Sequence, residues 1–240
     1  MCIRDSYGTE SIDPVDVIVG PGNVYVAVAK REVAGLVGVP SSFAGPSEIV
    51  VVADATTPVD YAAIDIVVQA EHGPGGQAWL VTWDEAVAEA VSDRVSEIAE
   101  TATRRDDIAS TLATGGFVAL VDNPHDAIVV ANRIAPEHLQ LMCAEPVGLV
   151  DQVRHAGEVF LGPLAPASLG DYVAGPSHVL PTSGTARFSG PLTCEDFTKP
   201  LHIVAVDQTA FDRLGPHVAT LADVEGLDCH AQSVRMRGVK

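Results

Sequence analysis

The sequence predicts an α/β protein with Rossmann-like parallel sheets covered by helices, followed by a helical C-terminal tail. Short runs rich in Val and Ile alternate with stretches of helical periodicity along most of the chain. Glycine and proline pairs separate these stretches. The strand candidates are continuously apolar, as expected for strands that helices cover on both faces. With 240 residues, of which 47% are hydrophobic, the chain can bury a sizeable, mainly aliphatic core.

Charge and cysteine content narrow the function classes. The formal net charge of -18 argues against nucleic acid or an anionic membrane as a partner. No run is long and apolar enough to predict a membrane span. The four cysteines show no paired spacing, which indicates a reducing cytoplasm without a disulfide framework.

The first predicted unit is a strand over 15–19, a turn over 20–23 and a helix over 24–33. Strand, glycine turn and helix form the layout of a dinucleotide-binding turn. Tyr25 stands where the third glycine of that motif would be. The segment is therefore interpreted equally well as a plain βα turn.

The next unit carries the first metal candidates. Ser47 lies in a turn before the strand 49–53, where it could face a site or simply form the turn. A helix then begins at Pro58 with Thr57 as its cap and ends before Gly73-Pro74. Gln69 and His72 lie three residues apart on its last turn, a spacing that allows one shared metal ion. A capping His beside a solvated Gln is the competing interpretation.

The alternation continues with a strand over 78–82, a helix from 85 to about 105, a strand over 117–121 and a helix over 124–134. Glu137 and His138 follow at the entrance of the strand 139–142. His exchanges protons near neutral pH and Glu can activate water, so the pair is an acid/base candidate or a helix-end polar pair.

After a strand over 158–161, the glycine-bounded loop 170–178 brings a carboxylate and an imidazole, Asp171 and His178. Residues 201–206 look like a strand. The tail from 207 onward is predicted to be helical and carries Glu225 and His230. A tail of this kind suggests docking on a partner subunit.

Taken together, several long segments resemble the histidinol dehydrogenase family, in the family's own order. The matching segments are YGTESIDPVDVIVGPGN, FAGPSEIVVVAD, QAEHGP, RIAPEHLQL, GDYVAGPSHVLPT, TARFSGPL and EGLDCHAQSVRMR.

The resemblance implies NAD-dependent, zinc-requiring oxidation of L-histidinol to L-histidine through L-histidinal. It implies Glu137 and His138 as the acid/base pair and Asn23 near NAD. The implied zinc ligands are Gln69, His72, Asp171 and His230. These four residues and His138 are also implied to contact the substrate. The implied further substrate contacts are Ser47, His178 and Glu225.

The resemblance also implies a domain division and a homodimer in which Glu225 and His230 act across the interface. Residues 1–6 are interpreted as a foreign leader. Residues 7–43 are interpreted as the remnant of a dinucleotide-binding domain. Residues 44–192 form the Rossmann-like domain with the zinc and acid/base residues, and 193–240 form a tail domain that docks on the partner. Impaired NAD binding is the expected consequence of so short a remnant. A zinc hydrolase that uses Glu137-activated water and a non-catalytic zinc module are the alternatives.

Overall fold

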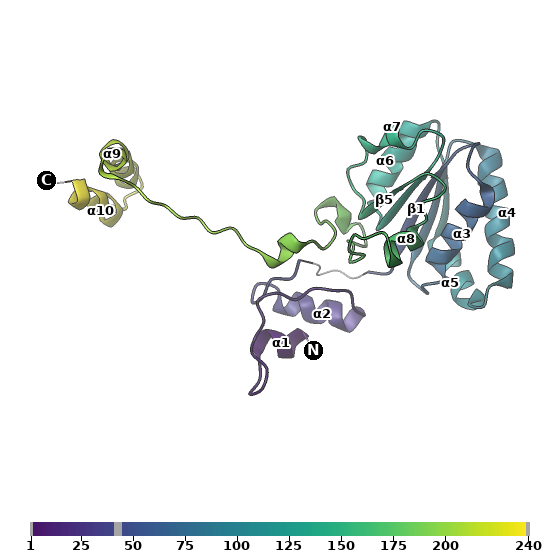
Figure 1. The fold of residues 1–240 in the computed structure, drawn as a ribbon, viewed down its shortest axis with the longest axis horizontal. Helices are drawn as coiled ribbons and strands as arrows, with labels where there is room; N and C mark the ends of the chain where they lie inside the picture. Colours follow the sequence, from purple (N-terminus) through teal and green to yellow (C-terminus); the bar gives the residue numbers. More distant parts are fainter. Residues whose placement is uncertain (1, 41–44, 239–240) are drawn as a thin grey trace. The chain divides into compact units, whose positions relative to one another are not determined.

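The computed structural model describes residues 2–40 and 45–238, which divide into two compact units, Met1–Phe197 and Thr198–Lys240 (Figure 1). The first unit contains a five-stranded sheet in which every neighbouring pair of strands is parallel. The strand order is β3-β2-β1-β4-β5. The strands are β1 (Glu48–Ala53), β2 (Gln77–Thr82), β3 (Gly116–Leu120), β4 (His138–Met142) and β5 (Glu158–Leu161). The predicted α/β class and parallel sheet are confirmed.

Helices cover both faces of the sheet (Figure 1). One face packs against α3 (Val59–Ala70), α4 (Glu85–Thr101) and α5 (Arg105–Gly115), and the other against α6 (Pro124–Ile134) and α7 (Val147–Val150). The central strand β1 is buried along its whole length. Its side chains alternate between two cores: Ile49 and Val51 join the α3 side, while Val50 and Val52 join the α6 side. This two-sided burial explains the unbroken apolar run.

The segment before the sheet departs from the predicted strand over 15–19. It holds α1 (Cys2–Tyr7) and α2 (Val24–Val33), and Val17 forms only an isolated bridge to Gly38. An apolar run becomes a strand only where a neighbouring strand continues the ladder. The predicted helix over 24–33 is confirmed, and the side chain of Asn23 caps it by accepting from the main-chain N–H groups of the second and third residues.

The predicted helix from 85 to about 105 is confirmed over 85–101, and only its last residues depart from the prediction. The helix α4 ends at Thr101, where Ala102 adopts an extended backbone, and α5 begins at Arg105. Asp106 and Asp107 in the first turn favour this new start, because acidic groups stabilise helix amino ends. The predicted Thr57 cap is wrong: its hydroxyl donates to the carbonyl of Met142 and accepts from Asp54 N–H.

The rest of the first unit contains α8 (Ala167–Tyr172) and two 3-10 helices, Thr185–Arg187 and Cys194–Phe197. In the second unit, residues 201–206 are exposed and form no strand with any described residue, so that prediction is wrong. The predicted helical tail is confirmed as α9 (Gln208–Val224) and α10 (Asp228–Gly238), which pack through small buried side chains such as Ala219 and Ala231. No helix in the described ranges has the length and apolar character needed to cross a membrane.

Candidate functional site

The predicted site residues of the first unit, apart from Asn23, gather at the amino edge of the sheet. Glu48, His138 and Glu158 are the first residues of β1, β4 and β5. The helix α3 follows β1 and returns across the sheet, so its carboxyl end reaches the same edge. Ligands of open α/β sheets more often bind at the opposite, carboxyl edge. Helix carboxyl ends carry partial negative charge, so this edge favours cations.

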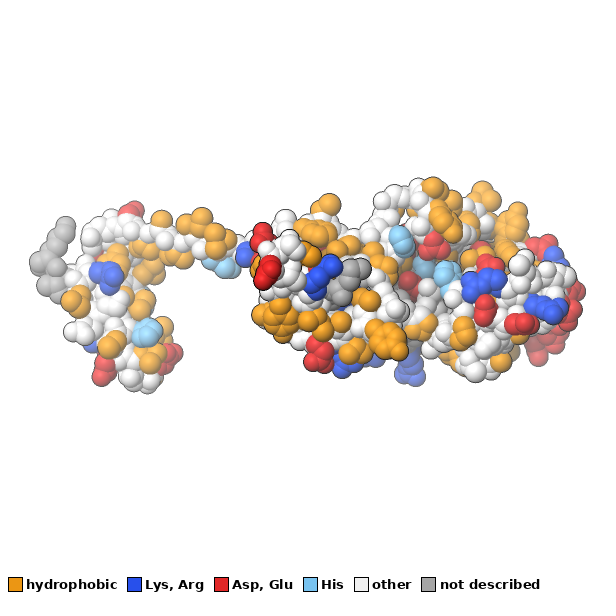
Figure 2. All heavy atoms as spheres, turned by 90° about the horizontal axis from the view of Figure 1, so that it is seen from below, with side chains coloured by type: hydrophobic (Ala, Val, Ile, Leu, Met, Phe, Trp, Pro, Cys, Tyr) orange, Lys and Arg blue, Asp and Glu red, His pale blue; other side chains and the backbone are white. Residues whose placement is uncertain are grey.

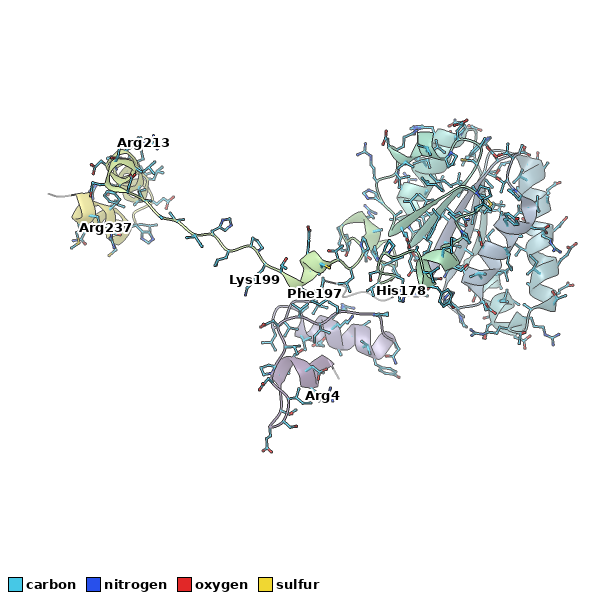
Figure 3. All side chains as sticks on the ribbon, in the orientation of Figure 1. Arg4, His178, Phe197, Lys199, Arg213 and Arg237 are labelled. Atoms are coloured by element: carbon cyan, nitrogen blue, oxygen red, sulfur yellow. The ribbon has the colours of Figure 1, made fainter. Side chains whose placement is uncertain are left out.

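A cavity of about 350 Å³ opens at this edge, a size that suits a small molecule. Figure 2 shows histidine and acidic side chains beside one another on the first unit. His178 lies on the loop after α8 (Figure 3). The cavity is lined by Gly20, Pro21, Gly45, Ser47, His72, Glu137, Asp171, Tyr172, His178, Val179, Leu180 and Thr182. Five predicted site residues therefore share one cavity, together with part of the 20–23 turn.

Glu137 and His138 form a buried pair beside this cavity. Glu137 Oε2 accepts from Glu48 N–H at 3.0 Å and lies 3.6 Å from His138 Nδ1. Burial raises the pKa of Glu137, against the opposing effects of His138, the Glu48 N–H group and the Ser47 hydroxyl. Burial alone would lower the pKa of His138, but the carboxylates of Asp171 and Glu137 raise it above its ordinary value. A buried carboxyl group with a raised pKa beside an imidazole is the kind of pair that acid/base catalysis uses.

The backbone fixes which ring nitrogen of His138 is free. His138 Nδ1 lies 3.2 Å from the carbonyl oxygen of Glu48, an acceptor only, so this contact places the proton on Nδ1. His138 Nε2 is buried, has no hydrogen-bond partner among the described residues and lies 3.6 Å from Asp171 Oδ1. A neutral His138 then presents an unprotonated Nε2, which is the form that a general base requires.

The first-unit candidates for metal binding are Gln69, His72 and Asp171. Interaction with His138 lowers the pKa of Asp171 against the effect of burial, and His72 and His178 lower it further. His72 Nδ1 lies 3.2 Å from the carbonyl of Val68, which leaves Nε2 for a ligand. Gln69 is buried, and its Nε2 has no hydrogen-bond partner in the described ranges. The described residues contain no group of three or more His, Cys, Asp or Glu that could hold a metal ion.

Three other predicted residues lie outside this cavity's lining. Asn23 is exposed and caps α2, next to the turn that contributes Gly20 and Pro21. Glu225 directly follows α9, and His230 lies in α10; both are exposed in the second unit. Their predicted roles across a subunit interface stay predictions.

Glu48 is a site residue that the sequence reasoning missed. Burial raises its pKa to about 7; the nearby Glu137 adds to this, and the N–H group of Ser183 opposes it. Its Oε1 accepts from Ser183 N–H at 3.1 Å. The available signal was a charged residue directly before the five apolar residues 49–53, a position that also suits an ordinary turn.

The pKa of Glu48 gives a pH-dependent contribution to stability. The folded state holds the proton more tightly than the unfolded chain, whose ordinary value is 4.5. This contribution is present below about pH 4.5 and is lost as the pH rises through about 7. Relative to Glu48→Gln, the wild-type free energy of unfolding should therefore fall between about pH 5 and pH 8. Urea unfolding of both proteins at several pH values measures this, and parallel profiles would contradict it.

The turn into β4 places Glu137. Ala135 ends α6 in the left-handed conformation, at φ 54°, and Pro136 then directs the chain into the strand. Gly157 passes close to this turn: its N–H donates to Pro136 O, and a Cβ built on it would lie 2.6 Å from Glu137 O. Glycine is required at 157 because the obstructing atom belongs to the backbone.

Gly157→Ala should therefore destabilise the fold by about 1–3 kcal/mol and displace Glu137. Gly148→Ala is the matched control, since a Cβ there has no neighbour within 4 Å among the described residues. Thermal and urea unfolding of the two variants gives the comparison. Equal stability of both variants would show that a Cβ at position 157 does not clash with the carbonyl oxygen of Glu137.

Comparisons with known proteins decide the family. The family model described as histidinol dehydrogenase matches residues 5–238. This chain belongs to the histidinol dehydrogenase family. It is 49% identical to the histidinol dehydrogenase of Nitrosomonas europaea and 46% identical to that of Bacillus cereus, in each case over 97% of this chain and 54% of the relative. The crystal structure of histidinol dehydrogenase from Elizabethkingia anophelis matches with a TM-score of 0.92 at 33% identity, over 98% of this chain and 54% of that one. The chain thus spans about half the length of these family members.

Proposed function

We propose that this chain forms the acid/base and metal-binding half of an enzyme that oxidises L-histidinol to L-histidine through L-histidinal, with two NAD⁺ as oxidants. The observation that carries the proposal is the buried His138, whose Nε2 has no hydrogen-bond partner among the described residues and lies 3.6 Å from Asp171, a carboxylate of the cavity that His72 also lines. In its neutral form, with the proton on Nδ1, this imidazole is a base. Such a base is what removal of an alcohol proton needs. Membership of the histidinol dehydrogenase family supports the choice of substrate.

The charge of the site supports a cationic substrate. Glu137 and Asp171 line the cavity, and Glu158 stands nearby, since His138 and Asp171 both act on its pKa. The carboxyl end of α3 adds partial negative charge at the same edge. Histidinol carries an ammonium group and an imidazole, so the field of this edge should attract it.

The donors in the first unit fit a zinc ion. His72 and Asp171 line the same cavity, and the buried Gln69 lies three residues before His72, where its amide oxygen would be the ligand. An imidazole, a carboxylate and an amide suit Zn²⁺, and His230 is the proposed fourth ligand, supplied by the partner subunit of a homodimer. Bound Zn²⁺ would act as a Lewis acid and orient the substrate's nitrogen atoms, while the hydrides pass to NAD⁺.

The chain's own residues would handle the protons. In the first oxidation His138 Nε2 takes the hydroxyl proton as a hydride leaves the alcohol carbon. In the second, Glu137 takes a proton from water as the water oxygen adds to the aldehyde carbon, and His138 returns its proton to the aldehyde oxygen, which gives the hydrate and restores the neutral ring. His138 then takes a proton from the resulting hydrate as the second hydride leaves. His178 and the partner's copy of Glu225 are proposed to bind the polar ends of the substrate, and Ser47 to hold Glu137.

NAD⁺ is proposed to approach from the 20–23 turn, whose Gly20 and Pro21 line the cavity, with Asn23 near the nicotinamide. The relatives are about twice as long, and we propose that residues without a counterpart in this chain complete their dinucleotide site. These 240 residues alone should then bind NAD⁺ weakly.

Calorimetric titration of a protein of the relatives' full length that contains this sequence tests the proposal. L-histidinol should bind to the zinc-loaded protein and lose most of its affinity after chelation. A simple ester of histidine should not be hydrolysed without NAD⁺. Ester hydrolysis that depends on zinc and Glu137, with no effect of NAD⁺, would contradict the proposal and favour a zinc hydrolase.

A further inference from the structure

The backbone of Glu48 contacts both members of the acid/base pair. Its N–H group donates to Glu137 Oε2 at 3.0 Å, and its carbonyl oxygen accepts from His138 Nδ1 at 3.2 Å. The Glu137 carboxylate and the His138 ring are therefore oriented by two consecutive peptide groups, at the first residue of β1. Any movement of this residue changes the direction of both side chains.

The side chain of Glu48 fixes that backbone in place. Only 5% of Glu48 is exposed, and its Oε1 accepts from Ser183 N–H at 3.1 Å. This bond joins residues 135 positions apart in the sequence. It connects the start of β1 to the turn over 182–185.

The turn over 182–185 is itself firmly held. The hydroxyl and N–H groups of Thr185 both donate to Thr182 O, at 2.7 and 3.1 Å. Gly45 N–H donates to Thr182 Oγ1 at 2.5 Å, and a Cβ on Gly45 would lie 2.1 Å from Ser183 Oγ. The turn therefore has its own contacts and can serve as an anchor for Glu48.

We propose that Glu48 is a positioning residue, whose side chain reaches Ser183 and thereby holds the peptide groups that orient Glu137 and His138. The inference depends on the proposed function only for the role of this pair in proton transfer. The raised pKa of Glu48 is consistent with it, because a protonated carboxyl group still accepts the Ser183 hydrogen bond through its carbonyl oxygen.

Two substitutions separate anchoring from charge. Glu48→Gln keeps the length of the side chain and its acceptor oxygen but removes the charge. Glu48→Asp keeps the charge but is one methylene shorter, so it cannot reach Ser183 without moving the backbone. If Glu48 acts as an anchor, Glu48→Gln should preserve function and Glu48→Asp should impair it. If Glu48 acts through its charge, the opposite results are expected.

The direct readout is the tautomer of His138, which does not depend on catalysis. The protein of the relatives' full length is labelled with ¹⁵N-histidine, freed of metal and studied at a pH where imidazoles are neutral. The His138 signals are assigned by their loss in His138→Gln. Wild type and Glu48→Gln should hold the proton on Nδ1, while Glu48→Asp should show a mixture of both tautomers. If Glu48→Gln loses the Nδ1–H form, or Glu48→Asp retains it fully, the proposal is overturned.

The second readout is the kinetics of the same variants with L-histidinol. Glu48→Asp should lower kcat about 10-fold or more with KM changed less than about 3-fold, because a misdirected base affects the transition state more than binding. Glu48→Gln should stay within about 3-fold of wild type in both. Gln77→Ala is the control: Gln77 pairs in register with Glu48 at the start of β2, and its side chain accepts from Trp79. If wild type does not oxidise histidinol, the proposed function fails while the tautomer measurement still decides this inference.

Discussion

His138→Asn should lower kcat for NADH formation from L-histidinol by about 10²–10⁴-fold in the protein of the relatives' full length, which is the usual contribution of a general base. Asn keeps a donor near the Glu48 carbonyl but cannot take a proton. KM should change much less than kcat, because the ring does not need to hold the substrate in order to accept its proton. Initial rates across a range of histidinol concentrations measure both constants.

His155→Asn is the control for that substitution. His155 belongs to the same unit, and its ring is not part of the cavity lining. It should leave kcat within about 2-fold, in keeping with its place outside the site. Comparable losses in the two variants would show that His138 is important for folding rather than as a base, and thermal unfolding would confirm that interpretation.

His72→Ala and Asp171→Ala should each weaken zinc binding by about 100-fold or more. Even substitution of groups behind the ligands costs 10–100-fold in metal affinity, so loss of a ligand should cost at least as much. Competition with a chromophoric chelator measures the affinity without any substrate. The control is His125→Ala, whose ring contacts Gln152 and lies outside the cavity lining.

The zinc measurement separates two interpretations of His72. If both variants bind zinc as tightly as wild type, His72 is only a helix-end residue that contacts the Val68 carbonyl. Partial restoration of zinc affinity by His72→Cys, which supplies a shorter thiolate ligand, would support direct coordination.

Much of the sheet could be predicted from the sequence because its strands correspond to distinct apolar runs. The run over 49–53 is apolar throughout, and the structure buries it between two helical layers. The runs over 15–19 and 201–206 are also mainly apolar, with one polar residue each, but neither has a neighbouring strand in the described residues. Local sequence cannot distinguish these cases, because pairing depends on distant residues.

The site was only partly predictable for a similar reason. Motif order pointed to Ser47, His72, Glu137, Asp171 and His178, and the structure brings these five to one cavity. Glu48 was not predicted as a site residue, because its contacts with the site are made by two peptide groups and by one long-range hydrogen bond to Ser183. Contacts made by backbone atoms can hardly be predicted from a single sequence.

The most direct measurement is the stoichiometry of NADH formed per L-histidinol by the full-length protein that contains this sequence. Oxidation of the alcohol to the carboxylate transfers two hydrides, so two NADH and one histidine should appear for each histidinol consumed. Chelation of zinc should abolish both products, and His138→Asn should slow the formation of both by about 10²–10⁴-fold. Release of one NADH with accumulation of free aldehyde would contradict the proposed role of Glu137 in activating water, and no NADH at all would contradict the proposed function.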